Sequence, residues 1–91
     1  MADLHELINA FAAAKAAYDR NADPDGPEWD AYEAAEHAII VYPCLTIEDV
    51  RLKARFFLDN SGPNDTLRNC FSADGPVVDV FLHSLLGGAQ P

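Results

Sequence analysis

The chain has 91 residues, of which 49% are hydrophobic and 23% charged, a composition typical of a folded protein and not of a disordered one. Fifteen acidic and six basic residues give a formal net charge of -9 at pH 7. Affinity for phosphate comes from Lys and Arg, so this balance argues against direct binding to nucleic acid or to an anionic membrane. The length suits a single domain spanning residues 1-91.

The start of the chain, Met1 to Leu4, has neither the basic nor the long apolar region of a secretory signal. The longest apolar run, Ala38 to Tyr42, is far shorter than the roughly 20 residues that cross a bilayer. We therefore expect a cytoplasmic protein with no membrane partner. Cys44 and Cys70 are isolated, which favours buried reduced thiols over a zinc or redox motif and leaves a bridge between them as the alternative.

The first predicted helix covers residues 3-20. Asp3 and Glu6 have the spacing of a capping box at its start. Lys15 interrupts the apolar stripe, where we expect its amine to reach water or, as an alternative, to pair with a carboxylate. The apolar residues that recur on this face are Leu4, Leu7, Ile8, Phe11, Ala14 and Tyr18.

A second helix is predicted over residues 28-42, after a turn-rich segment that ends at Pro27 and before Pro43, which stops it. Its expected core arc consists of Ala31, Tyr32, Ala35, Ala38, Ile39 and Tyr42. A mixed strip at spacings of three and four consists of Trp29, Glu33, Glu36 and Ile40. This strip places an aromatic and an aliphatic group among carboxylates.

A third helix over residues 47-59 has the clearest start signal, with Thr46 as N-cap and Asp49 three residues later. We expect Asp49 to pair with Lys53. The predicted apolar face consists of Ile47, Val50, Ala54, Phe57 and Leu58. Leu52 and Phe56 lie on roughly the opposite side, where they are either sandwiched inside the protein or available for self-association.

Residues 60-76 are expected to form loops, with a short turn at 66-71 as an alternative. A buried last helix is predicted over residues 77-86, although its valines also favour a strand. No second strand candidate is available to pair with it. The predicted fold class is all-α, a compact bundle of three to four helices.

The sequence contains no pattern that indicates catalysis. Glu33 and His37 are four residues apart, whereas a carboxylate-bridged metal bundle uses Glu-x-x-His on two helices. The cysteines and histidines are scattered, and no glycine-rich phosphate loop is present. We expect no catalytic, cofactor-binding or metal-ligating residue, and therefore no enzyme.

The acidic residues from the end of the first helix through the second have no comparable basic partners nearby. A protein partner with a basic surface is the interpretation that this charge favours. Trp29 is the expected aromatic anchor, with edge-of-core packing as its alternative. The full predicted partner-binding set is Asp23, Asp25, Glu28, Trp29, Asp30, Glu33, Glu36 and Ile40. The alternative function is a structural or regulatory homodimer that buries either Leu52 and Phe56 or the alanine side of the first helix.

The order of features includes an alanine-rich first helix, an acidic second helix, Tyr42-Pro43, Thr46 with Val50 and Lys53, and a final segment from Leu82 to Leu86. This order resembles short uncharacterised helical proteins of alphaproteobacterial genomes, prophages and mobile elements. In size and acidity the chain is also similar, by class, to phage-encoded inhibitors such as anti-CRISPR proteins. The resemblance implies a context, namely an inhibitor that mimics nucleic acid, and no site residue.

Overall fold

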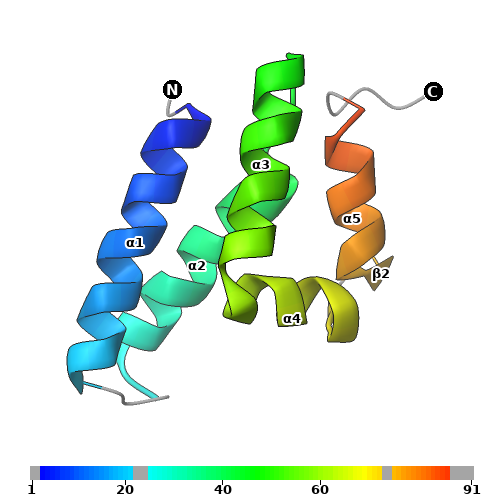
Figure 1. Ribbon diagram of the computed structural model, residues 1–91. Coiled ribbons are helices and arrows are strands. Elements are labelled where there is room, and N and C mark those ends of the chain that lie inside the picture. Colours follow the sequence, from blue (N-terminus) through cyan, green and yellow to red (C-terminus); the bar gives the residue numbers. More distant parts are fainter. Residues whose placement is uncertain (1–2, 22–24, 73–74, 87–91) are drawn as a thin grey trace. The chain divides into compact units, whose positions relative to one another are not determined.

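The computed structural model describes residues 3-21, 25-72 and 75-86, and these form five helices and one hairpin of two-residue strands (Figure 1). The predominantly helical class is confirmed, but the described helices outnumber the predicted three to four. They are α1 (Leu4–Asn21), α2 (Pro27–Val41), α3 (Ile47–Asp59), α4 (Ser61–Asn69) and α5 (Val77–Ser84). The chain divides into two compact units, residues 1-39 and 40-91.

In the first unit, α1 and the larger part of α2 run antiparallel as a helical hairpin (Figure 1). The backbone N–H of Glu6 donates to Asp3 Oδ1 at 2.9 Å, which confirms the capping interaction predicted there. Lys15 Nζ lies 3.0 Å from Asp19 Oδ2, so its amine forms the ion pair that was the alternative. Pro27 begins α2, where its missing N–H removes no helical hydrogen bond.

The buried side of α2 includes most of the predicted core arc, with Ile39 fully buried, but it extends further around the helix. Ala31 was expected in the core and is exposed, whereas Glu36 and Ile40, expected on the mixed strip, are buried. The difference follows from side-chain size, since burying Ile40 removes far more apolar surface from water than burying Ala31. Asp30 and Glu33, which lie outside the predicted core arc, are exposed.

In the second unit, α3 and α5 run antiparallel and α4 crosses between their ends (Figure 1). Thr46 is the N-cap of α3 as predicted, because its Oγ1 accepts a hydrogen bond from the Asp49 N–H at 3.1 Å. The rings of Phe57 and Phe81 join α3 to α5, with their centres 5.1 Å apart in edge-to-face geometry.

The buried face of α3 also differs from the predicted one. Phe56 and Phe57 are both buried and pack edge to face at 5.1 Å, whereas Ile47 and Leu58 are exposed. Two aromatic rings bury more apolar area than the two aliphatic side chains, so the helix turns its aromatic side inward. Lys53 lies on this buried side as well, and its predicted pairing with Asp49 is wrong.

α4 occupies a segment that was predicted as loop. Pro63 is tolerated because it lies in the first turn, where backbone N–H groups have no helical acceptor. The side-chain amides of Asn60 and Asn64 donate to the carbonyl oxygens of Phe56 and Phe57, at 2.8 and 2.9 Å. These bonds satisfy the last carbonyls of α3 and hold the two helices at a sharp corner.

A short hairpin precedes the last helix. β1 (Phe71–Ser72) and β2 (Gly75–Pro76) are antiparallel, with Phe71 opposite Pro76. Gly75 has a φ of 113°, a backbone conformation that residues other than glycine rarely adopt. The helix predicted over residues 77-86 is confirmed for Val77–Ser84, and the competing strand is excluded there. The prediction that this helix is buried is wrong, because only Val77 and Ser84 are buried and Leu82 is exposed.

Candidate functional site

The negative charge is concentrated in the first unit. Residues 1-39 contain nine acidic and two basic residues, a formal charge of -7, whereas residues 40-91 contain six and four, a charge of -2. An excess of negative charge on a small unit produces an electric field that attracts basic surfaces over several ångströms. The first unit is therefore the part of the chain that attracts a basic surface more strongly.

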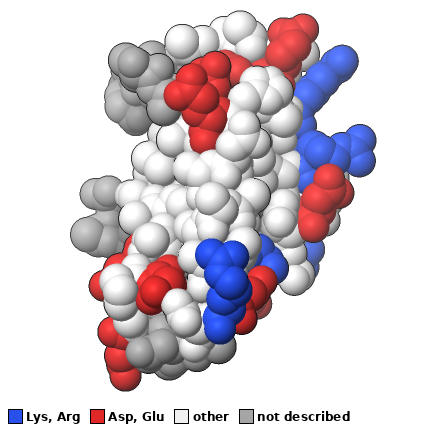
Figure 2. Space-filling model, turned by 90° about the vertical axis from the view of Figure 1, so that its left-hand side faces the viewer, with Lys and Arg blue, Asp and Glu red and all other residues white. Residues whose placement is uncertain are grey.

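That charge is not spread evenly over the surface. In Figure 2 the Asp and Glu side chains form separate groups with uncharged surface between them. Within α1, the stretch from Leu7 to Ala14 has no charged residue, and its exposed side chains are Asn9 and three alanines. The middle of α1 thus contributes no charge to the surface of the first unit.

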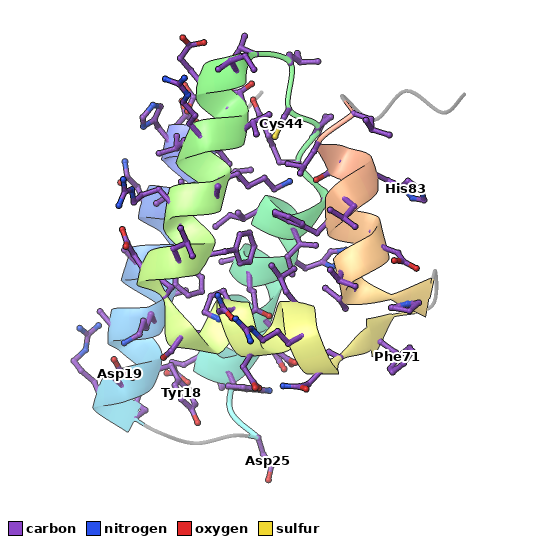
Figure 3. The ribbon with its side chains drawn as sticks, turned by 45° about the vertical axis from the view of Figure 1, so that its right-hand side comes forward. Tyr18, Asp19, Asp25, Cys44, Phe71 and His83 are labelled. Carbon is purple, nitrogen blue, oxygen red and sulfur yellow. The ribbon has the colours of Figure 1, made fainter. Side chains whose placement is uncertain are left out.

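The predicted partner-binding residues separate into exposed and buried groups. Asp25, Asp30 and Glu33 are exposed, and Asp25 projects outward from the loop that precedes α2 (Figure 3). Glu28 and Trp29 are half-buried, Glu36 and Ile40 are buried, and Asp23 lies outside the described residues. We call Asp25, Asp30 and Glu33 the acidic face.

The side-chain carboxylates of Asp30 and Glu33 make no hydrogen bond or ion pair with any residue that the structure describes. Glu28 differs, because its Oε1 accepts a hydrogen bond from Asn21 Nδ2 at 2.8 Å and so ties the end of α1 to the start of α2. Two carboxylates one helical turn apart therefore remain hydrated and available to cations from outside the described chain.

Trp29 belongs to an aromatic cluster that packs α1 against α2. Its ring stacks on Tyr32 at 5.4 Å with an interplanar angle of 10°, and it meets Tyr18 at 5.1 Å. Tyr32 in turn contacts Phe11 at 5.1 Å. This packing agrees with the edge-of-core alternative for Trp29, and since the residue is only half-buried, part of its surface still faces solvent beside Asp30.

The titration of Tyr32 reflects the same surroundings. Burial raises the pKa of its phenol, and the nearby carboxylates of Glu36 and Asp19 raise that pKa further by opposing a second negative charge. The hydroxyl therefore stays protonated near neutral pH. Tyr32 acts here as a packing residue that keeps a polar edge.

The residues predicted for self-association do not form an exposed pair. Phe56 is buried on α3, and Leu52 is half-buried. Phe56 packs against Phe57 within the second unit, so its ring is not available at the surface. The apolar side chains that the second unit does expose lie elsewhere, mainly on α5 and at the two ends of α3.

The second unit contains a lysine whose burial was not predicted from the sequence. Lys53 has 0% of its surface exposed, and its Nζ donates to Ile40 O and Tyr42 O, both at 2.8 Å, and to Ser84 Oγ at 2.6 Å. Ser84 Oγ donates in turn to Phe81 O at 2.5 Å. Three N–H bonds of an ammonium thus meet three acceptors from two other parts of the chain.

The arrangement makes Lys53 a cap for α2 that comes from another helix. Ile40 and Tyr42 lie at the carboxyl end of α2, whose last turn contains no basic residue of its own. Carbonyl oxygens at that end have no helical donor and carry the negative end of the helix dipole, so a cation is stabilising there. In the sequence, the absence of a basic residue from the last turn of α2 indicates that the capping cation has to come from elsewhere. The sequence alone does not show which lysine provides it.

Burial lowers the pKa of Lys53 to about 8, and the nearby Cys44 offsets part of this effect. Burial also raises the pKa of the Cys44 thiol, an effect that the Lys53 charge partly opposes and Asp49 reinforces. A lysine with a lowered pKa is a common nucleophile, but that role requires access for a substrate. The enclosed amine and its three acceptors instead favour a structural role for Lys53.

Both cysteines are free, but only one is buried as predicted. Cys44 lies on the segment after α2 that passes the end of α5, and its N–H donates to Ser84 O at 2.9 Å (Figure 3). Cys70 is exposed, which corrects the expectation of two buried thiols. Across residues 3-21, 25-72 and 75-86, no three His, Cys, Asp or Glu side chains gather as metal ligands, and no helix has the length and hydropathy to span a bilayer.

Comparison of the chain with protein-family models, with curated proteins and with solved structures finds no match.

Proposed function

We propose that the protein is a non-enzymatic interaction protein of the cytoplasm that binds a basic surface of another protein through the acidic face. The observation that carries this proposal is the charge of -7 on residues 1-39, together with Asp30 and Glu33, which no described residue neutralises. Carboxylates without a partner in their own chain are stabilised by Lys or Arg side chains of a binding partner. The planar guanidinium of Arg is the strongest such partner.

Trp29 gives the acidic face an apolar edge. Its ring is fixed by Tyr18 and Tyr32, so little side-chain entropy is lost when its remaining surface is covered. Trp and Tyr bordered by charged residues are the residue types that contribute most to binding at protein interfaces. In this proposal the fixed indole provides apolar contact and the carboxylates provide orientation and attraction.

The chemistry of the acidic face also suggests which basic surfaces it suits. A protein channel that holds nucleic acid presents Lys and Arg to phosphates, and closely spaced carboxylates compete for the same cations. We therefore propose inhibition of a nucleic-acid-binding complex, in the manner of the phage or prophage inhibitors that the chain resembles by class. Direct binding to nucleic acid itself is not part of the proposal, because the first unit has only two basic residues.

The experiment is capture of partners from a bacterial lysate with a tagged chain, repeated after nuclease treatment and across a salt series. We expect a specific protein that persists after nuclease treatment and is released as salt rises, because screening weakens contacts between exposed charges. Recovery of no protein, or of a partner whose binding is insensitive to salt, would contradict the proposal.

A further inference from the structure

The outer side of α5 leaves a line of apolar side chains exposed. Val78 and Leu82 lie four residues apart on α5 and Leu86 follows in the turn after the helix, and 39%, 51% and 63% of their surfaces are exposed. Phe71, 77% exposed, lies opposite Pro76, the residue directly before α5, and so extends the line at the start of the helix. We call these four residues the α5 stripe.

We propose that the α5 stripe binds the α5 stripe of a second copy of the chain, with the two helices antiparallel across a twofold axis. Water-exposed apolar lines of this kind are rare on monomers and are typical of interaction surfaces. Val78 and Leu82, at i and i+4, lie on one side of α5, and a twofold axis lets the same side serve both copies.

The charged neighbours of the α5 stripe determine the orientation. Asp79 and His83 are exposed, lie four residues apart on one flank of the stripe, and His83 projects outward from α5 (Figure 3). In an antiparallel pair the same flank of both helices meets, so Asp79 of one copy faces His83 of the other, twice by symmetry. An imidazole N–H then donates to a carboxylate at each position.

Net charge favours this part of the chain for self-association. Residues 40-91 carry a formal charge of -2, against -7 for residues 1-39, so pairing through α5 brings the less charged parts into contact. This surface shares no residue with the acidic face. The proposal of a dimer and the proposal of a basic partner can therefore be tested separately.

The test is sedimentation equilibrium of the full chain over a range of micromolar concentrations. We expect a dimer for the wild type and a dimer dissociation constant raised about tenfold or more by Leu82→Glu, because a charge is then buried at the centre of the interface. Leu58→Glu is the matched control, since Leu58 is exposed on α3 outside the α5 stripe, and it should leave the dissociation constant unchanged.

A charge exchange tests the orientation without placing a new charge in the apolar line. Asp79→His and His83→Asp should each weaken the dimer, and the double exchange should restore it, because each carboxylate again faces an imidazole. A wild type that stays monomeric, including one that uses the stripe only for a different protein, would overturn the proposal. A dimer that Leu82→Glu leaves unchanged would overturn it as well.

Discussion

At the scale of single residues, Lys53 shows how one side chain links separate segments of the second unit. Its ammonium satisfies two carbonyl oxygens at the end of α2 and the hydroxyl of Ser84 on α5. Taking a charge out of water is costly, and the lowered pKa is the sign of that cost. The three hydrogen bonds to an ionised donor offset it and fix where the segment after α2 runs.

Lys53→Met should lower the free energy of unfolding at pH 7 by about 2 kcal/mol, because it leaves buried acceptors at Ile40, Tyr42 and Ser84 without their donor. Chemical denaturation followed by circular dichroism measures the change. Lys15→Met is the control, since Lys15 is exposed and forms only a surface ion pair with Asp19. An unchanged stability of the Lys53 variant would show that the three bonds contribute nothing net.

The same pair of proteins gives a pH dependence with a defined sign. The pKa of Lys53 is about 8 in the folded chain, against 10.5 for a free lysine, so between these values the unfolded chain binds more protons. The stability of the wild type relative to Lys53→Met should therefore rise by up to about 3 kcal/mol from pH 8 to 10.5. Below pH 8 the difference should be flat, and a fall above pH 8 would contradict this account.

At the scale of elements, helix ends and large side chains decide the structure more than the count of apolar positions. The start of α3 was predictable because Thr46 and Asp49 form a local capping pattern that needs no knowledge of the fold. The buried sides of α2 and α3 were predictable only in part, because several faces were apolar and tertiary packing also buried Ile40 and Phe56. α4 was missed because its stabilising contacts, from Asn60 and Asn64, are made to the preceding helix.

Thr46→Ala should cost about 1 kcal/mol of stability, because the Asp49 N–H loses its acceptor at the start of α3. Thr46→Ser retains the hydroxyl and should remain close to the wild type. Thermal unfolding of the three proteins measures the difference. Equal stability of the Ala and Ser variants would show that the cap is not stabilising in solution.

Packing of α1 against α2 gives a separate prediction for Trp29. Trp29→Ala should lower stability by on the order of 2 kcal/mol, because it removes a half-buried ring that contacts Tyr18 and Tyr32. Trp29→Phe keeps a ring over Tyr32 and should lose less than half as much. The Phe variant is therefore the one in which a contribution of Trp29 to partner binding can be measured on a folded protein.

At the scale of the whole molecule, the uneven division of charge is the feature most relevant to function. The acidic character was evident from composition, and the exposed positions of Asp25, Asp30 and Glu33 agree with their predicted place outside the core. The sequence could not show that Glu36 and Ile40 are buried, because helical spacing gives the centre of the core arc of α2 and not how far burial extends around the helix. It also could not locate the exposed apolar residues on α5, since that helix is apolar on nearly every side.

The central claim is that binding of a basic partner depends on the residues of the acidic face and not simply on the net charge of the chain. The most direct measurement compares capture of that partner by the triple variant Asp25→Asn, Asp30→Asn, Glu33→Gln with capture by a triple variant of the second unit, Glu48→Gln, Asp59→Asn, Asp65→Asn. The residues of the second set are exposed too, and both variants lose three negative charges.

We expect the acidic-face variant to bind about tenfold more weakly or worse and to lose most of the salt dependence, since contacts between complementary charges determine both. The second-unit variant should bind nearly as the wild type does. Equal loss in both variants would assign the effect to net charge, and full binding by the acidic-face variant would contradict the proposed function.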